Sequence, residues 1–220
     1  MSRSLKIVVA DDEPNMRDYL RELLPRLGHE VVAVSDGAQL VEICRVTKPD
    51  LIITDIKMGG LDGMEAAEAV NREREVPVIL VSAYHEPALQ ARALRGHVMA
   101  YLVKPVKQPD LESAIGMAMM RFEHYRALRQ EAADLRQALE DRKVIERAKG
   151  AVTKRLRVDE EEAFRRLRKL ASVHNRKLVE VAQTVLAGEM LFAELEQGAH
   201  AGPGHGPGIA GGTTPRETRP

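Results

Sequence analysis

Short apolar runs alternate with helical patterns along the first 120 residues of the chain. The runs are rich in Val, Ile and Leu, end at polar residues, and lie at 5–10, 31–34, 51–55, 78–81 and 99–103. Such runs are typical of strands buried on both faces of a parallel sheet, and helical patterns separate each pair. Because right-handed crossovers cover both faces, this order predicts a doubly wound α/β domain with a five-stranded parallel sheet.

Polar side chains follow four of the predicted strands. Asp11 and Asp12 follow the first strand, Asp55 ends the third, Ser82 follows the fourth, and Lys104 follows the fifth. The carboxyl ends of parallel strands meet at one edge, where open α/β sheets place their chemistry. Taken singly, each residue has an ordinary interpretation as a cap, a strand-end hydroxyl or a solvated charge. Together they predict one polar site.

This arrangement resembles the receiver domain of two-component response regulators, and the resemblance covers residues 1–120. It rests on five motifs in order, which are VADDE at 9–13, ITDIKM at 53–58, LDG at 61–63, VSA at 81–83 and YLVKP at 101–105. The resemblance implies a flavodoxin-like fold and a sensor histidine kinase as partner. The chain departs from the family pattern at Gly59, where a proline often follows the methionine, and Ser82 stands where threonine is also frequent.

Three crowded carboxylates repel one another unless a cation lies among them, and Mg²⁺ prefers oxygen ligands. We therefore expect Asp11, Asp12 and Asp55 to bind Mg²⁺, and the resemblance implies that Asp55 is also the phosphoacceptor. By the same resemblance, the receiver accepts and slowly loses its own phosphoryl group and is otherwise no enzyme.

The resemblance assigns roles to three further residues. Ser82 and Lys104 are expected to contact the phosphoryl oxygens, and Tyr101 is expected to be the aromatic switch residue. A half-buried strand aromatic with no such role is the alternative for Tyr101. The peptide bond from Lys104 to Pro105 is usually cis in the family, which an X-Pro bond tolerates.

A long helix is predicted to begin after Pro109. No proline occurs from 111 to 157, and the only glycines there are Gly116 and Gly150. This helix contains a short heptad seam, formed by Leu128, Ala132, Leu135 and Leu139. The seam predicts a coiled-coil linker at 121–141 that pairs two chains as a homodimer on activation. Arg142 falls on the seam and ends it. A helix that packs on its own receiver is the alternative.

Residues 142–197 predict a small all-α three-helix bundle. After a break at Gly150, a second helix starts with Asp159 as cap and Glu162 completing a capping-box-like pair. A third helix is predicted to begin near Asn175 and to end at Gly188. The predicted apolar faces of these two helices are Ala163, Phe164, Leu167, Leu170 and Ala171, and then Leu178, Val181, Ala182, Val185 and Leu186.

This segment is similar to the ANTAR domain, the RNA-binding module of transcription antitermination regulators. The similarity rests on RKVIERAKG at 142–150, AFRRLR at 163–168, Asn175, and VEVA at 179–182. The family recognises paired short RNA hairpins with hexanucleotide loops, and it favours an antiterminator over an overlapping terminator. The resemblance therefore implies that phosphorylation promotes dimerisation and binding of leader RNA hairpins.

The distribution of charge agrees with two halves that have different partners. Residues 1–120 carry 14 basic and 18 acidic side chains, a net charge of −4, whereas residues 142–177 carry 13 and 5, a net charge of +8. The candidate RNA-binding residues are Lys149, Lys154, Arg165, Arg168 and Arg176, although a charge-rich helix is usually a solvated face. A DNA-binding transcription factor and a protein scaffold are the alternatives for this half.

The rest of the chain adds little chemistry. The sequence shows neither a signal peptide nor a membrane span, and the single cysteine, Cys44, is expected to be a buried small hydrophobe. These features predict a cytoplasmic protein in a reducing compartment. The Gly- and Pro-rich residues 198–220 predict a disordered tail, in which weak metal binding by His200 and His205 is the alternative.

Overall fold

The computed structural model describes residues 4–83 and 97–198. The chain forms two compact units, Met1–Glu131 and Ala132–Pro220. The helix predicted between the fourth and fifth strands lies largely outside the described residues. So does the predicted tail from residue 199 on, which includes His200 and His205.

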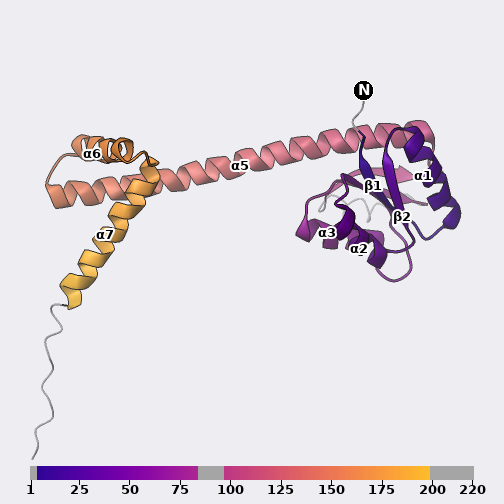
Figure 1. Cartoon of the computed structure of the whole chain (residues 1–220), viewed down its shortest axis with the longest axis horizontal. Helices are drawn as coiled ribbons and strands as arrows, with labels where there is room; N and C mark the ends of the chain where they lie inside the picture. The colour runs from indigo at the N-terminus through magenta and orange to yellow at the C-terminus, as the bar shows by residue number, and fades with distance from the viewer. Residues whose placement is uncertain (1–3, 84–96, 199–220) are drawn as a thin grey trace, which may run out of the picture. The chain divides into compact units, whose positions relative to one another are not determined.

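The first unit contains the predicted parallel sheet (Figure 1). Its strands are β1 (Lys6–Ala10), β2 (Glu30–Val34), β3 (Leu51–Asp55), β4 (Val78–Ser82) and β5 (Val98–Val103). They are all parallel and lie in the order β2-β1-β3-β4-β5, which confirms the predicted flavodoxin-like fold. The two central strands β3 and β4 are buried over their whole length, as their continuous apolar runs predict.

Helices α1 (Pro14–Arg26), α2 (Gly37–Thr47) and α3 (Gly63–Glu73) connect the first four strands. Pro14 lies in the first turn of α1, where its missing N–H group costs nothing. The carboxylate of Asp36 accepts a hydrogen bond from the Gln39 amide at 2.8 Å, and so begins α2. Asp62 begins α3 in the same way, through the Glu65 amide at 2.7 Å.

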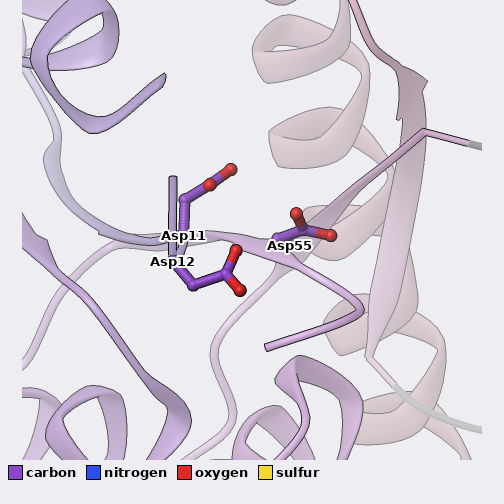
Figure 2. Close-up of side chains that lie close together, drawn as sticks. All are labelled: Asp11, Asp12 and Asp55. Atoms are coloured by element: carbon purple, nitrogen blue, oxygen red, sulfur yellow. The ribbon is translucent and has the colours of Figure 1, made fainter. Parts of the chain in front are cut away.

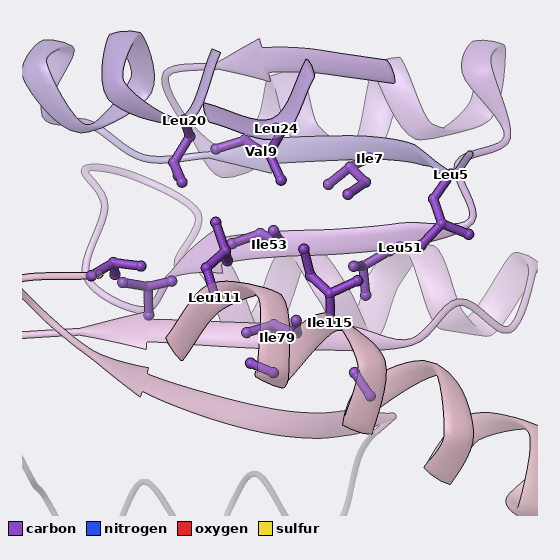
Figure 3. Close-up of a cluster of buried hydrophobic side chains, with 14 of the residues drawn as sticks. Leu5, Ile7, Val9, Leu20, Leu24, Leu51, Ile53, Ile79, Leu111 and Ile115 are labelled. Atoms are coloured by element: carbon purple, nitrogen blue, oxygen red, sulfur yellow. The ribbon is translucent and has the colours of Figure 1, made fainter. Parts of the chain in front are cut away.

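Two apolar clusters cover the two faces of the sheet. One lies against α1 and the start of α5 (Gln108–Leu156), where Leu20, Leu24, Leu111 and Ile115 meet strand residues such as Ile53 (Figure 3). The other packs α2 and α3 against the opposite face. Aliphatic side chains dominate both clusters, because the chain has no Trp and few other aromatic residues.

Cys44 lies in the cluster beneath α2 and is 5% exposed, which confirms that it is a buried small hydrophobe. Burial raises the pKa of its thiol to about 12, so the thiolate is scarce at neutral pH. Among the described helices, none is both long and apolar enough to cross a membrane.

The second unit is the predicted three-helix bundle, formed by the end of α5 with α6 (Glu160–Val173) and α7 (Leu178–Gly198). Asp159 caps α6 through the Glu162 amide at 2.7 Å, as predicted. The buried core is small and consists of Ala148, Leu167, Ala171, Val181 and Ala182. Leu170 lies at its edge and is 44% exposed.

Two predicted helix ends are wrong. We expected a break at Gly150, but α5 continues through this residue to Leu156. A glycine inside a helix costs about 1 kcal/mol relative to alanine, and packing around the fully buried Ala148 offsets this cost. We expected the last helix to end at Gly188, but α7 continues to Gly198.

Contacts with α5 explain the longer α7. Arg155 pairs with Glu189 at 3.6 Å, and its guanidinium lies 4.2 Å from the ring centroid of Phe192. Both partners lie beyond Gly188, so the helix gains contacts there. The start of α7 is also later than predicted, because Asn175 has a positive φ of 49° and belongs to the turn after α6.

We expect Gly63→Ala to lower the free energy of unfolding by about 1–3 kcal/mol. A Cβ atom at Gly63 would overlap the backbone carbonyl oxygen of Asp55 and crowd the hydroxyl of Thr54, because α3 begins directly against the end of β3. Urea unfolding followed by circular dichroism measures the change.

Gly59→Ala is the matched control for this substitution. No atom lies within 4 Å of a Cβ atom at Gly59, so this variant should unfold like the wild type. Equal stability of the two variants would contradict the close approach of α3 to Asp55.

Candidate functional site

The three predicted metal ligands lie together at the carboxyl ends of β1 and β3 (Figure 2). One carboxylate oxygen from each of Asp11, Asp12 and Asp55 lies within 4.8 Å of the other two. Asp11 is 2% exposed and Asp55 7% exposed, whereas Asp12 is exposed. The set therefore has two buried carboxylates and one that is exposed to solvent.

Lys104 joins this cluster from the end of β5. Its ammonium lies 2.6 Å from Asp55 Oδ2, 3.0 Å from Asp11 Oδ2 and 2.8 Å from Glu13 Oε1. Burial alone lowers the pKa of Lys104, but its hydrogen bonds to the three carboxylates outweigh burial and raise the pKa above its usual value. The ammonium is therefore charged at any physiological pH.

The backbone around Lys104 fixes the position of this side chain. The amide of Lys104 donates to the carbonyl oxygen of Ser82 at 2.9 Å, so the end of β5 is held beside the end of β4. The peptide bond to Pro105 is cis, as the resemblance implied. Ser82 is 3% exposed and Tyr101 is half-buried.

The surroundings of Asp11 shift its pKa. Burial raises its pKa above the usual value, and the nearby charge of Asp55 raises it further. Hydrogen bonds from the Glu13 amide, at 2.9 Å, and from Lys104 act in the opposite direction but do not cancel the effect of burial. The buried charge of Asp11 is thus incompletely compensated by the protein.

The donor set fits a hard divalent cation. Lys104 supplies one positive charge to a cluster with four carboxylates, from Asp11, Asp12, Glu13 and Asp55. A cation bound by oxygen ligands would balance the excess negative charge and would suit Mg²⁺, which commonly keeps several waters and a phosphate oxygen. The acidic site is therefore of the type that binds Mg²⁺.

Further hydrogen bonds hold the carboxylates in place. Arg17 donates to the carbonyl oxygens of Asp11 and Asp12 at 2.8 and 2.9 Å, which fixes the loop after β1. The amide of Lys57 donates to Asp55 Oδ1 at 3.2 Å. No role was predicted for Glu13 or Arg17 from the sequence, where the acidic run at 11–13 was the only signal for Glu13.

The five candidate RNA-binding residues come from three parts of the second unit. Lys149 and Lys154 lie on α5, Arg165 and Arg168 on α6, and Arg176 in the turn before α7. Lys149 is the least available, because it contacts Glu146 at 2.6 Å and Glu160 at 3.0 Å and its side chain is 16% exposed. It ties α5 to the start of α6.

The other candidates are exposed but partly engaged. Arg165 pairs with Glu162, and Arg176 pairs with Glu180 at 3.3 Å. The guanidinium of Arg168 lies 5.9 Å from the ring centroid of Phe164. These contacts keep the cations at the surface, where an anionic partner could compete for them.

Comparison with known proteins matches both units. Residues 7–116 match the family of response regulator receiver domains, and residues 133–186 match the ANTAR domain family. The transcriptional regulatory protein PdtaR of Mycobacterium tuberculosis is 37% identical over 182 residues, which cover 82% of this chain and 89% of PdtaR. The chain is a response regulator of the receiver–ANTAR family.

Solved structures show the same receiver fold. A response regulator receiver domain protein from Clostridium thermocellum aligns with a TM-score of 0.51 and 29% identity, over 55% of this chain and 98% of the other. The receiver domain of a modulated diguanylate cyclase from Desulfovibrio desulfuricans aligns with a TM-score of 0.52 and 27% identity, over 56% and 99%.

Membership of the receiver–ANTAR family determines the general biochemistry. The chain is a non-enzymatic regulator: its receiver implies a histidine kinase as partner, and its ANTAR domain implies RNA binding in transcription antitermination. The acidic site of this receiver–ANTAR regulator contains the receiver's candidate metal ligands.

We expect Lys104→Met to make the first unit less stable and more responsive to Mg²⁺. Removal of the ammonium leaves Asp11 and Asp55 without their cation, which should cost about 1–3 kcal/mol in the absence of metal. Added Mg²⁺ should then raise the melting temperature by more than in the wild type, because it replaces the lost positive charge.

Lys107→Met is the control, because Lys107 is exposed and has no ion pair within the described residues. It should melt like the wild type with and without Mg²⁺. An identical Mg²⁺ response in all three proteins would show that the cation does not bind at this acidic site.

Proposed function

We propose that the chain is a phosphorylation-gated antitermination regulator in which Asp55 is the phosphoacceptor. The observation that carries this proposal is the 2.6 Å contact between Asp55 Oδ2 and Lys104, within the acidic site formed by Asp11 and Asp12. A carboxylate beside both a fixed ammonium and a site for Mg²⁺ can meet a phosphoryl group whose oxygens need positive charge.

The proposed reaction transfers a phosphoryl group from a histidine of the kinase. An oxygen of Asp55 attacks the phosphorus, the P–N bond to the imidazole breaks, and an acyl phosphate forms on Asp55. Asp11, Asp12 and Asp55 would hold Mg²⁺, which when bound supplies positive charge to the transferring oxygens. The Lys104 ammonium then exchanges its contact with Asp55 for one with a phosphoryl oxygen.

Two residues near the acidic site are proposed to pass the signal on. Ser82 ends β4 and shares a backbone hydrogen bond with Lys104, which supports the proposal that its hydroxyl meets a phosphoryl oxygen. Tyr101 is half-buried on the neighbouring strand β5, at the edge of the sheet. Movement of Ser82 toward the phosphate would allow Tyr101 to turn inward.

The long helix offers a surface for dimerisation. The seam residues Leu128, Leu135 and Leu139 are 66%, 60% and 59% exposed within one chain. Full burial of such a side chain contributes about 1.5–3 kcal/mol of stabilisation, so burial of the leucines between two paired seams would stabilise a dimer. We propose that phosphorylation shifts the population toward the chain that pairs this way and binds hairpin RNA.

We expect beryllofluoride with Mg²⁺ to tighten binding to a two-hairpin hexaloop RNA by about 5- to 150-fold, the range of typical coupling between two sites. Filter binding to this RNA and to the matching DNA duplex measures it. In Asp55→Asn, which cannot form the acyl phosphate, the tightening should be lost while basal binding remains. Asp50→Asn, which changes a carboxylate that caps the Lys6 amide far from the acidic site, is the matched control.

The outcomes separate the parts of the proposal. Unchanged tightening in Asp55→Asn would contradict Asp55 as the phosphoacceptor. Tighter binding to duplex DNA than to RNA would favour a DNA-binding transcription factor instead.

We expect Leu135→Asn to weaken dimerisation of the activated protein by more than tenfold, because each chain then buries an amide in place of a leucine. Sedimentation velocity at several protein concentrations measures the change. Gln137→Asn places the same residue on the outer face of the helix, and it should leave dimerisation intact. A dimer that tolerates both substitutions equally would not be formed by the seam.

A further inference from the structure

The second unit contains a small pocket between the end of α6 and the first turns of α7. Its volume is about 210 Å³, which is below the roughly 300–1,000 Å³ of pockets for drug-sized ligands and suits a single ring system. Its walls are formed by Leu170, His174, Arg176, Val181, Thr184 and Val185. Neither the heptad seam nor the acidic site contributes to it.

The floor of the pocket is apolar and belongs to the core of the bundle. Val181 is 2% exposed and belongs to the core of the bundle, and Val185 packs against the same core. Leu170 forms one wall from α6, and its 44% exposure is unusual for a leucine on the inner side of this helix. A flat apolar face that entered the pocket would cover this side chain.

The rim is polar and offers both donors and acceptors. The hydroxyl of Thr184 donates to the Glu180 carbonyl oxygen at 2.9 Å, so its oxygen can still accept a hydrogen bond. Arg176 uses its Nε–H group on Glu180 at 3.3 Å, which holds the planar guanidinium along α7. His174 adds an imidazole at the end of α6.

The turn geometry fixes this rim. Asn175 has a φ of 49°, and the amide of Arg176 donates to the Ala171 carbonyl oxygen at 2.9 Å, which closes the end of α6. His174 and Arg176 are therefore held on either side of one constrained residue.

Positive charges outnumber negative ones in the segment that contains the pocket wall from α6. Residues 163–179, the segment to which the lining residues Leu170, His174 and Arg176 belong, contain six Arg or Lys and no Asp or Glu. Glu180, which follows, is paired with Arg176. A partner that enters the pocket must therefore tolerate nearby positive charge, as a nucleotide with its phosphate does and a basic peptide does not.

We propose that this pocket receives one unpaired base of the bound RNA and reads its edge. The base would lie against Leu170, Val181 and Val185, while Thr184, Arg176 and His174 meet its polar edge. RNA is read mainly through unstacked bases in loops, which proteins hold against their side chains. This inference rests on the proposed RNA binding and adds a site for base selection to it.

The test replaces each loop nucleotide of the two-hairpin RNA in turn by an abasic residue, with the full-length activated protein. For the wild type, affinity should fall by about tenfold or more at one loop position and little at its neighbours. Thr184→Phe fills the mouth of the pocket from an exposed helix position, so it should weaken binding to intact RNA and should lose this position dependence.

Two further variants make the result specific. Gln183→Phe places the same ring on the next exposed position of α7, outside the pocket, and it should retain both the affinity and the position dependence of the wild type. Arg165→Gln removes a cation from the far part of α6, so it should lower affinity for every RNA alike and reduce its salt dependence. Circular dichroism confirms that each variant is folded.

The possible outcomes distinguish failure of the base pocket from failure of RNA binding. A flat abasic profile in the wild type, or a Thr184→Phe variant that keeps the position dependence, would overturn the base pocket and leave RNA binding intact. Failure of the wild-type protein to bind the RNA at all would overturn the proposed function and the pocket with it. Binding of a peptide ligand at the pocket without any effect on RNA would also overturn the inference.

Discussion

The receiver depends on one unbalanced set of charges at the carboxyl edge of its sheet. Lys104 reaches Asp11 from β1 and Asp55 from β3, although two strands separate β5 from β1 in the sheet. The one ammonium cannot balance the negative charge of all the carboxylates around it. The site therefore has an excess of negative charge that a further cation would balance. A phosphoryl group and its metal change this same balance, which makes the sheet edge sensitive to both.

The sheet and its polar edge could be predicted from the sequence because both follow from short-range patterns. Continuous apolar runs specify buried parallel strands, and parallel strands bring the residues at their ends to one edge, so Asp55 and Lys104 meet without any knowledge of side-chain packing. Glu13 was missed because its contact with Lys104 joins residues 91 positions apart through an exposed side chain. The periodicity of apolar residues in the sequence does not indicate a contact of this kind.

Helix ends in the second unit could not be predicted from local signals. A glycine lowers helix stability by about 1 kcal/mol wherever it occurs, but whether a helix ends there depends on the contacts beyond it. Packing around Ala148 stabilises α5 on both sides of Gly150. The contacts of Arg155 with Glu189 and Phe192 stabilise α7 beyond Gly188. These are tertiary contacts between helices, so the sequence pattern of either helix alone does not contain them.

The same contacts limit how the second unit can select RNA under the proposed function. Its net charge of +8 over 142–177 overstates the free positive surface, because Lys149 holds α5 to α6 and Arg165 and Arg176 are paired with carboxylates. Attraction to phosphates is also independent of sequence, so charge alone would bind any RNA hairpin. Selection among hairpins then requires a binding surface of defined shape at a fixed position on the protein. The bundle provides this where the constrained turn at Asn175 leaves a small apolar hollow beside three polar groups.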